Sequence, residues 1–444
     1  MGRHMMAWAA LTLLVLLAGC HSAVTDGPLR ARTGGGLDRG WQTTLPEGYD
    51  GWTVMTSKRC VLLFAWSTGL EEATATRALR CHDPESGKLR WEQIIPVPAG
   101  FVYDRIHLAD DRVIYQNNHH MRGLDMDDGQ EVWVFQASDP ETGSGWVIGE
   151  ALVAHDRVLI SLSHDSIGVL DAQSGRWIRG IEAPSHRLIG AWDHKKHGLV
   201  ALAVMVSNSL GQESQGKLVA IRTDVDGGER PGPPFAAQKR AWERDIETNT
   251  YDIHMIGDVL IGHLSRGELW GLRPENGEVL YKVPGTSNAV DFMDLSEIPD
   301  VIGPNELAMV SSRDFQRGKG PKKDHMVVLG QNQVVLTQGH RKGFAMSLLE
   351  VQAHNPRNFK PSWSVQLPSQ EFFRFQQPLR DLGATLIAGG RFFVIVDVAD
   401  GKVLWRRDAD PEDQDWTSVS TNGRGLYVVY GRQAQPRLEA YPIR

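Results

Sequence analysis

The chain has 444 residues, of which 41% are hydrophobic and 23% charged, so it holds enough apolar material to bury a sizeable core. Its formal net charge of −7 is a modest argument against nucleic acid as a partner, because phosphate backbones attract basic surfaces. A chain of this length often forms several domains, but a single all-β fold can also reach this size.

The N-terminus predicts export and membrane attachment. Arg3 and His4 precede an apolar run, Ala7–Ala18, which has the length of a signal-peptide core and is too short to span a bilayer. The four residues that end at Cys20, LAGC, resemble the bacterial lipoprotein signal. The resemblance implies that residues 1–19 are removed and that Cys20 is lipid-modified. The alternative is an ordinary secretory signal followed by a chance cysteine.

The residues after Cys20 predict where the protein resides. His21 follows it rather than Asp, which by resemblance to Gram-negative sorting implies the outer membrane, with a lipid anchor and a periplasmic position. Residues 20–39 include Gly34–Gly36 and predict a flexible tether. The folded domain is then expected over residues 40–444.

A disulfide is expected near the start of this domain, in a compartment that permits one. Cys60 opens the predicted strand CVLLFAW and Cys81 ends the predicted strand ATRALRC. A hairpin that turns near Leu70 would place the two cysteines opposite one another. Closing a loop of about 20 residues contributes roughly 3 kcal/mol in the chain-entropy model. A metal site is less favoured, because no His or Asp pair shares the cysteine spacing.

A repeat phrase dominates the rest of the chain: a short strand, Asp, a turn, Gly, and an aromatic residue four positions after the Gly. The Asp is expected to accept backbone N–H bonds within the turn, and the Gly to supply a positive φ. A repeat of about 40 to 50 residues that is rich in strand formers favours a β-propeller. The phrase occurs as Gly87 with Trp91, Gly129 with Trp133, Gly175 with no aromatic at the fourth position, Gly277 with Tyr281, and Gly401 with Trp405.

The spacing of the phrase predicts the number of blades. Gly87, Gly129 and Gly175 lie 42 and 46 residues apart, while gaps of 102 and 124 residues later on each leave room for one degenerate unit. Trp242 and Trp363 fit those two units. We therefore expect an all-β, eight-bladed β-propeller closed by an N-terminal strand, Gly40–Pro46, that pairs with the C-terminal strands.

The repeated aromatics are expected to wedge between neighbouring blades, because one four-stranded sheet cannot bury both of its faces alone. Stacking on sugars is the functional alternative. Two departures stand out: Trp177 follows Gly175 by two residues, and Arg273 replaces one turn Asp. The predicted inter-blade set is Trp41, Trp91, Trp133, Trp242, Tyr281, Trp363 and Trp405.

No catalytic residue, metal site or cofactor is predicted. The histidines at 119–120 and 194–197 fall in expected surface turns. The stretch 224–228 lacks the downstream Glu of a calcium loop. Residues 313–324 form a basic insertion, interpreted as a solvated loop, with acidic lipid headgroups or an acidic partner as the alternative.

Repeats that end in turn-Gly-Lys-x-x-Trp, as at Gly87–Trp91 and Gly401–Trp405, resemble those of the pyrroloquinoline-quinone (PQQ)-type propellers, over about residues 41–444. That group includes quinoprotein alcohol dehydrogenases and the BamB-like lipoproteins of the outer-membrane β-barrel assembly machinery. The lipoprotein signal, the size, the inferred blade number and the closing strand are similar to the BamB-like members. The resemblance implies a non-catalytic scaffold whose loops bind envelope proteins, here the β-barrel assembly machinery. No binding residue carries over.

Two other functions stay open. A PQQ-dependent dehydrogenase of this type would carry a vicinal disulfide, which Cys60 and Cys81 cannot form, together with a calcium set and a general-base Asp that the sequence does not locate. A carbohydrate-binding propeller would need aromatic residues exposed together on one face. The candidates for such a face are Trp52, Trp66, Trp146, Trp192, Trp270 and Trp416.

Overall fold

The computed structural model describes only part of the chain, and the statements that follow concern that part. The chain divides into two compact units, residues 1–36 and 37–444. The predicted signal peptide (1–19), Cys20, the tether (20–39) and most of the basic insertion (313–324) lie outside the described residues. Described are residues 40–67, 74–98, 104–109, 111–137, 147–154, 156–163, 165–184, 186–206, 215–232, 234–247, 253–256, 258–265, 268–283, 310–311, 323–329, 334–342, 345–367, 373–379, 383–389, 392–408, 416–431 and 436–443.

Every named element of the second unit is a β-strand, and the strands form eight antiparallel sheets. Sheet 1 holds β2 (Gly51–Thr56), β3 (Val61–Trp66), β4 (Thr74–His82) and β5 (Leu89–Pro98). Sheet 2 holds β6 (Arg105–Leu108), β7 (Arg112–Gln116), β8 (His120–Asp125) and β9 (Glu131–Gln136). Sheet 3 holds β10 (Ile148–Ala154), β11 (Arg157–Leu162), β12 (Ser166–Asp171) and β13 (Trp177–Glu182). Sheet 4 holds β14 (His186–His194), β15 (Gly198–Val206), β16 (Gln215–Arg222) and β17 (Arg240–Glu247).

The remaining sheets continue in chain order. Sheet 5 holds β18 (Ile253–Ile256), β19 (Val259–Ser265), β20 (Glu268–Leu272) and β21 (Val279–Val283). Sheet 6 has five strands, β22 (Val310–Ser311), β23 (Lys323–Leu329), β24 (Val334–Lys342), β25 (Ala345–His354) and β26 (Pro361–Leu367). Sheet 7 holds β27 (Phe373–Leu379), β28 (Ala384–Gly389), β29 (Phe392–Asp397) and β30 (Val403–Asp408). Sheet 8 holds β31 (Trp416–Thr421), β32 (Gly425–Tyr430), β33 (Arg437–Pro442) and β1 (Trp41–Thr44).

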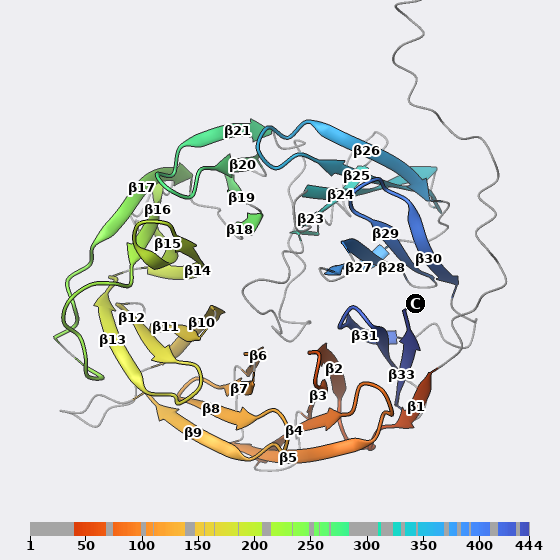
Figure 1. Cartoon of the computed structure of the whole chain (residues 1–444), viewed down its shortest axis with the longest axis horizontal. Helices are drawn as coiled ribbons and strands as arrows, with labels where there is room; N and C mark the ends of the chain where they lie inside the picture. Colours follow the sequence, from red (N-terminus) through yellow and green to blue (C-terminus); the bar gives the residue numbers. More distant parts are fainter. Residues whose placement is uncertain are drawn as a thin grey trace, which may run out of the picture. The chain divides into compact units, whose positions relative to one another are not determined.

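Sheet 8 is built from both ends of this unit. β1 pairs with β33 in antiparallel register, from Trp41 opposite Ala440 to Thr44 opposite Arg437. The backbone N–H of Gly40 extends the ladder by donating to the carbonyl of Ala440 at 2.9 Å. The N-terminal strand therefore covers an edge of β33 that would otherwise be free. In Figure 1, β1 takes the rim position that β5, β9 and β13 take in their own sheets.

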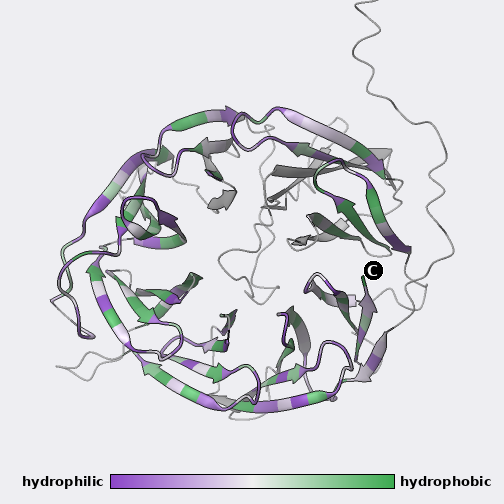
Figure 2. Cartoon of the chain, in the orientation of Figure 1, coloured by the Kyte–Doolittle hydropathy of each residue, from purple (hydrophilic) through white to green (hydrophobic). Residues whose placement is uncertain are grey.

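Inner strands such as β3 are continuous apolar runs, because both faces of these strands are buried. Successive side chains of β3 point to opposite faces of sheet 1. Val61 and Leu63 pack in one cluster with Tyr427 of sheet 8, whereas Leu62 packs in another with Tyr115 of sheet 2. Inner strands are thus buried on both faces. Rim strands such as β9 carry exposed as well as buried residues. Figure 2 shows both hydrophilic and hydrophobic residues along these outer strands.

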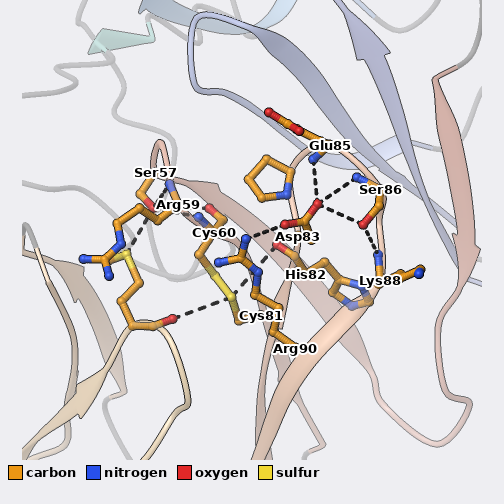
Figure 3. Close-up of polar contacts among 12 residues, drawn as sticks. Ser57, Arg59, Cys60, Cys81, His82, Asp83, Glu85, Ser86, Lys88 and Arg90 are labelled. Carbon is orange, nitrogen blue, oxygen red and sulfur yellow. Dashed lines mark hydrogen bonds and ion pairs between the residues drawn. A yellow bond between two sulfur atoms is a disulfide. The ribbon is translucent and has the colours of Figure 1, made fainter.

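A disulfide joins Cys60 and Cys81, whose Cα atoms are 5.7 Å apart. Cys60 lies directly before β3, which starts one residue later than the sequence predicted, and Cys81 lies in β4. Both cysteines belong to the apolar cluster between sheets 1 and 2. The bond ties the β3–β4 hairpin together beside the first repeat turn (Figure 3).

Among the described residues, no helix has both the length and the apolar character needed to cross a membrane.

Candidate functional site: the repeat turns and a pocket at the terminal sheet

The first repeat turn shows how the repeat phrase folds. A side-chain oxygen of Asp83 accepts the backbone N–H groups of Glu85 at 3.1 Å and Ser86 at 2.9 Å, and Arg90 pairs with the other oxygen (Figure 3). These contacts, with Arg90 first, hold the pKa of the Asp83 carboxyl far below its ordinary value. Gly87 closes the turn with a φ of 70°. The Asp is therefore engaged in the turn and supports its shape.

A buried histidine supports the same turn from within. The Nδ1 atom of His82 donates to the carbonyl of Gly87 at 3.0 Å. Burial lowers the pKa of His82, so the ring is neutral near pH 7. His354 makes the equivalent contact with the carbonyl of Phe359 at 3.1 Å in sheet 6, so the two histidines are structural.

Five of the repeat tryptophans lie on the turn of the next sheet. Trp405 does not, because its buried indole nitrogen has no hydrogen-bond partner among the described residues and its ring packs in the cluster of Tyr441. In each of the five cases the indole Nε1–H donates to the carbonyl of the second turn residue, and the ring covers the turn's glycine where that glycine is present. A Cβ on Gly129 would come within 2.6 Å of the Trp91 ring, so only glycine fits beneath the indole. The contacts are Trp41 to Pro84 at 3.0 Å, Trp91 to Met126 at 2.9 Å, Trp133 to Ala172 at 3.2 Å, Trp242 to Pro274 at 2.7 Å and Trp363 to Val398 at 2.8 Å.

Trp177 is a member of this set that the repeat spacing did not identify. Its indole Nε1–H donates to the carbonyl of Gly228 at 2.9 Å, and 8% of the residue is exposed. Here the simple turn is replaced by a longer excursion, of which Gly228 and Ala236 lie along the rim of β13. Ala236 donates to the carbonyl of Gly180 at 2.8 Å, and Gly180 donates to the carbonyl of Gly228 at the same distance. The two-residue offset from Gly175 concealed this role in the sequence.

Tyr281 keeps the inter-sheet position with different chemistry. The turn that it faces carries Phe359 where the other turns carry glycine, and Phe359 has a positive φ of 53°. The two rings lie 5.6 Å apart between centroids. The phenolic OH of Tyr281 is buried without a hydrogen-bond partner in the described part of the chain, and burial raises the pKa of Tyr281 above its ordinary value. Ring packing therefore replaces the indole–carbonyl bond at this junction.

We expect Gly129→Ala to lower the free energy of unfolding by about 2–5 kcal/mol. A positive φ of 71° costs a non-glycine residue about 1–2 kcal/mol, and overpacking against Trp91 adds about 1–3 kcal/mol. Gly198→Ala is the matched control, because Gly198 has a φ of 62° but no atom within 4 Å of the added Cβ. Urea unfolding measures both variants. Equal losses would contradict the claim that the indole needs the glycine.

A pocket of about 390 Å³ lies where the first repeat turn meets sheet 8. Tyr427 donates to the carbonyl of Pro84 at 3.3 Å across this junction, and burial raises the pKa of Tyr427 to about 12. Glu85 and Arg424 also line the pocket, and neither side chain makes an ion pair with another described residue. The lining is Gly40, Trp41, Lys58, Asp83, Pro84, Glu85, Arg90, Asn422, Arg424, Gly425, Tyr427, Ala440, Tyr441 and Pro442.

This pocket combines aromatic walls with charges of both signs. Asp83 is already engaged by Arg90, and Tyr427 stays protonated at neutral pH. Such a lining suits the mixed polar and apolar side chains of a protein partner. Glu85 and Arg424 contribute one charge of each sign to this lining.

The histidine clusters lie at the ends of hairpins, and the prediction of surface turns is correct only for His119 and His197, because His120 and His194 belong to strands and His194 is buried. His120 begins β8 after the β7–β8 turn, and His194 ends β14 before the turn that contains His197. The rings of His194 and His197 lie 4.8 Å apart. No group of three or more potential metal-ligating side chains occurs within the described ranges.

The aromatic residues considered for a sugar-binding face are mostly in the core. Only 4% to 8% of each of four tryptophans is exposed, so these four cannot form an exposed platform. They are Trp52, Trp192, Trp270 and Trp416. Trp66 is partly buried, and Trp146 lies outside the described residues.

Comparisons with known proteins bear on the family and the fold. A family model described as "Outer membrane protein assembly factor BamB" matches residues 38–283. No curated protein matches the chain by sequence. The computationally designed Ika8 protein is 12% identical over 90% of this chain and 98% of its own, with a TM-score of 0.52, and so has a similar fold.

Two natural proteins have lower structural similarity. BamB from Moraxella catarrhalis is 11% identical over 91% of this chain and 98% of its own, with a TM-score of 0.47. The quinohemoprotein alcohol dehydrogenase ADHIIG from Pseudomonas putida HK5 is 11% identical over 90% of this chain and 78% of its own, with a TM-score of 0.44.

Proposed function

Because the chain belongs to the family described as outer membrane protein assembly factor BamB, we propose that it is a non-catalytic scaffold that binds envelope proteins, in particular those that assemble outer-membrane β-barrels. The family match over residues 38–283 is the observation that carries this proposal. The repeated polar side chains support it, because residues such as Asp83 are engaged in turns. In the turns that the structure describes, such contacts support a rigid frame.

We further propose that the eight sheets are the blades of a closed propeller and that β1 closes the ring by pairing with β33. Trp41 on β1 lies against the turn of sheet 1, so the same contact that joins other neighbouring sheets also joins sheet 8 to sheet 1. Rigid blades would present their connecting loops as a fixed contact surface.

The proposal includes a lipid anchor on Cys20 that holds the scaffold at the periplasmic face of the outer membrane. The LAGC sequence at the end of the apolar run supports this assignment. A tether of this kind keeps the scaffold near membrane-bound partners and so raises their effective concentration.

We expect Cys20→Ala to move the protein from the membrane fraction to the soluble fraction without lowering its thermal stability, because residue 20 lies outside the unit that contains the sheets. Fractionation of cells that express each form, followed by immunoblotting, measures the change. A variant that stays in the membrane fraction would contradict the lipid anchor.

The pocket at sheet 8 is the contact that we assign to a partner. A photo-crosslinking amino acid at position 85 should form adducts with outer-membrane assembly proteins in living cells. The matched control is position 245 on the rim strand β17, where the Asp side chain is 90% exposed. Adducts from position 85 alone would support the assignment, and equal labelling from both positions would contradict it.

The non-catalytic part of the proposal has its own test. Purified protein supplied with PQQ, calcium and an artificial electron acceptor should oxidise none of a panel of alcohols and sugars. Turnover of any of them would show that the chain is a dehydrogenase.

A further inference from the structure

The outer edge of β9 carries valine where several other described rim strands carry a charge. A strand at the edge of a sheet presents unpaired backbone groups, and proteins protect such edges with charged side chains or by covering them. On β9, the residue after the repeat aromatic is Val134, and 48% of it is exposed. Val132 on the same strand is 47% exposed. The charged residues at the position of Val134 are Glu92 on β5, Glu243 on β17, Lys282 on β21 and Arg406 on β30.

The remaining described rim strands are polar or covered at this position. β1 has Gln42 and β26 has Ser364. β13 has Gly180, and its edge is covered by the longer excursion of the chain. The N–H of Gly180 donates to the carbonyl of Gly228, and the carbonyl of Gly180 accepts the N–H of Ala236, both at 2.8 Å. A rim edge of this fold can therefore bind an added extended segment.

The covered edge of β13 also shows which backbone groups of β9 are free. Gly180 lies opposite Gly168 of β12, in the second pair from the bulge, and Val134 lies opposite Arg122 of β8 in the same place. Since Gly180 directs its N–H and carbonyl away from β12, Val134 directs its own away from β8. β9 is the last strand of its sheet on the outer rim, and no described strand pairs with its outer edge (Figure 1). Val134 thus offers a donor, an acceptor and an exposed apolar side chain.

The strand that fits this edge is β9 of a second copy of the chain. Two antiparallel copies related by a two-fold axis place Val134 opposite Val134, where the two residues exchange both backbone hydrogen bonds. Residues 132–136 are uncharged, so no like charges face one another across the pair. The nearest charge on the same face, Arg122 of β8, is already balanced by Glu131 at 3.3 Å.

The same arrangement is unfavourable at the charged rim edges. A two-fold pair of β5 would place Glu92 opposite Glu92, and a pair of β17 would place Glu243 opposite Glu243. Like charges directly opposite one another destabilise a sheet. Lys282 on β21 and Arg406 on β30 have the same effect. Because β9 alone among the described rim strands has an uncovered apolar residue at this position, association ends at two copies.

We infer that two copies of this chain associate through an antiparallel β9–β9 pair centred on Val134. The inference rests on the rim strands and does not depend on the scaffold function. Two associated copies would present every connecting loop twice, which raises the avidity for a partner that has two binding sites.

Cysteine cross-linking of the purified full-length protein tests the pairing. In a hydrogen-bonded antiparallel pair the two Cα atoms lie about 5.5 Å apart, within the range of a disulfide. Val134→Cys should therefore form a disulfide-linked dimer under mild oxidation, seen as a doubled mass on a non-reducing gel. Glu92→Cys is the matched control at the same position of β5 and should stay monomeric. Absence of the dimer from Val134→Cys, or equal amounts from both variants, would overturn the inference.

Analytical ultracentrifugation measures the association without an added cysteine. The average mass of the unsubstituted protein should rise with concentration towards that of two copies. Val134→Glu gives β9 the carboxylate that β5 and β17 carry, and should weaken dimerisation at least about tenfold because like charges then face one another. Since Val134 is half exposed, Val134→Glu should keep the thermal unfolding transition of the unsubstituted protein.

Three results would contradict the β9–β9 pair. The first is an unsubstituted protein that stays monomeric at every concentration. The second is a dimer whose affinity does not change in Val134→Glu, which would place the interface elsewhere. The third is a photo-crosslinker at position 134 that captures only other envelope proteins in living cells, which would assign the edge to a strand of a different partner.

Discussion

Trp133→Ala is expected to lower the free energy of unfolding by about 3–5 kcal/mol, the range found when a buried aromatic side chain is removed. Only 7% of Trp133 is exposed, and it packs in one cluster with Met121 of sheet 2 and Ile160 of sheet 3. The substitution also leaves the carbonyl of Ala172 without its indole donor. Urea unfolding followed by circular dichroism measures the loss.

Trp133→Phe is the graded control for this result. It keeps much of the ring volume but removes the N–H, so we expect a smaller loss, of about 1–2 kcal/mol. Both variants should unfold in one transition if the sheets support one another. A loss of less than about 1 kcal/mol for Trp133→Ala would show that the inter-sheet tryptophans are not important for stability.

Replacement of both Cys60 and Cys81 by Ala is expected to lower the free energy of unfolding by about 3 kcal/mol. The two residues are 21 positions apart, and the stabilisation arises in the chain-entropy model because the bond restricts the unfolded chain. Both side chains are buried beside the first repeat turn, on which Trp41 lies. Loss of the disulfide should therefore also weaken the contact between sheet 8 and sheet 1.

A reducing agent provides the control within the same experiment. Reductant should lower the stability of the unsubstituted protein towards that of the double variant and should leave the double variant unchanged. If the unsubstituted protein contains two free thiols that react with a labelling reagent after unfolding, the disulfide is absent in the purified protein and the prediction fails.

The local parts of the fold could be predicted from the sequence because short-range chemistry determines them. Asp83 with Gly87 specifies a turn through two backbone bonds and one positive φ, all within five residues. The aromatic residue at a fixed distance then indicates the inter-sheet contact. The pairing of the Trp41 strand with the C-terminal strands could also be predicted, because the N-terminal strand and the last C-terminal strand each had an edge without a partner strand.

The parts that were not predicted depend on contacts between distant residues. Trp177 was missed because its acceptor, Gly228, lies in an excursion 51 residues away that no spacing rule describes. The presence of Phe359 at a glycine position could not be interpreted from the sequence, because Tyr281 lies against it only in the folded chain. The pocket at sheet 8 combines residues from both ends of the unit, and no local motif marks such a site.

The scaffold function is tested most directly by affinity purification of the tagged protein from crosslinked and gently solubilised envelopes, with mass spectrometry of the proteins that co-purify. The account predicts recovery of outer-membrane β-barrel assembly proteins with the unsubstituted chain and a much lower yield with Cys20→Ala. If the unsubstituted chain is recovered alone, or with partners that have no part in outer-membrane assembly, the proposed function is contradicted.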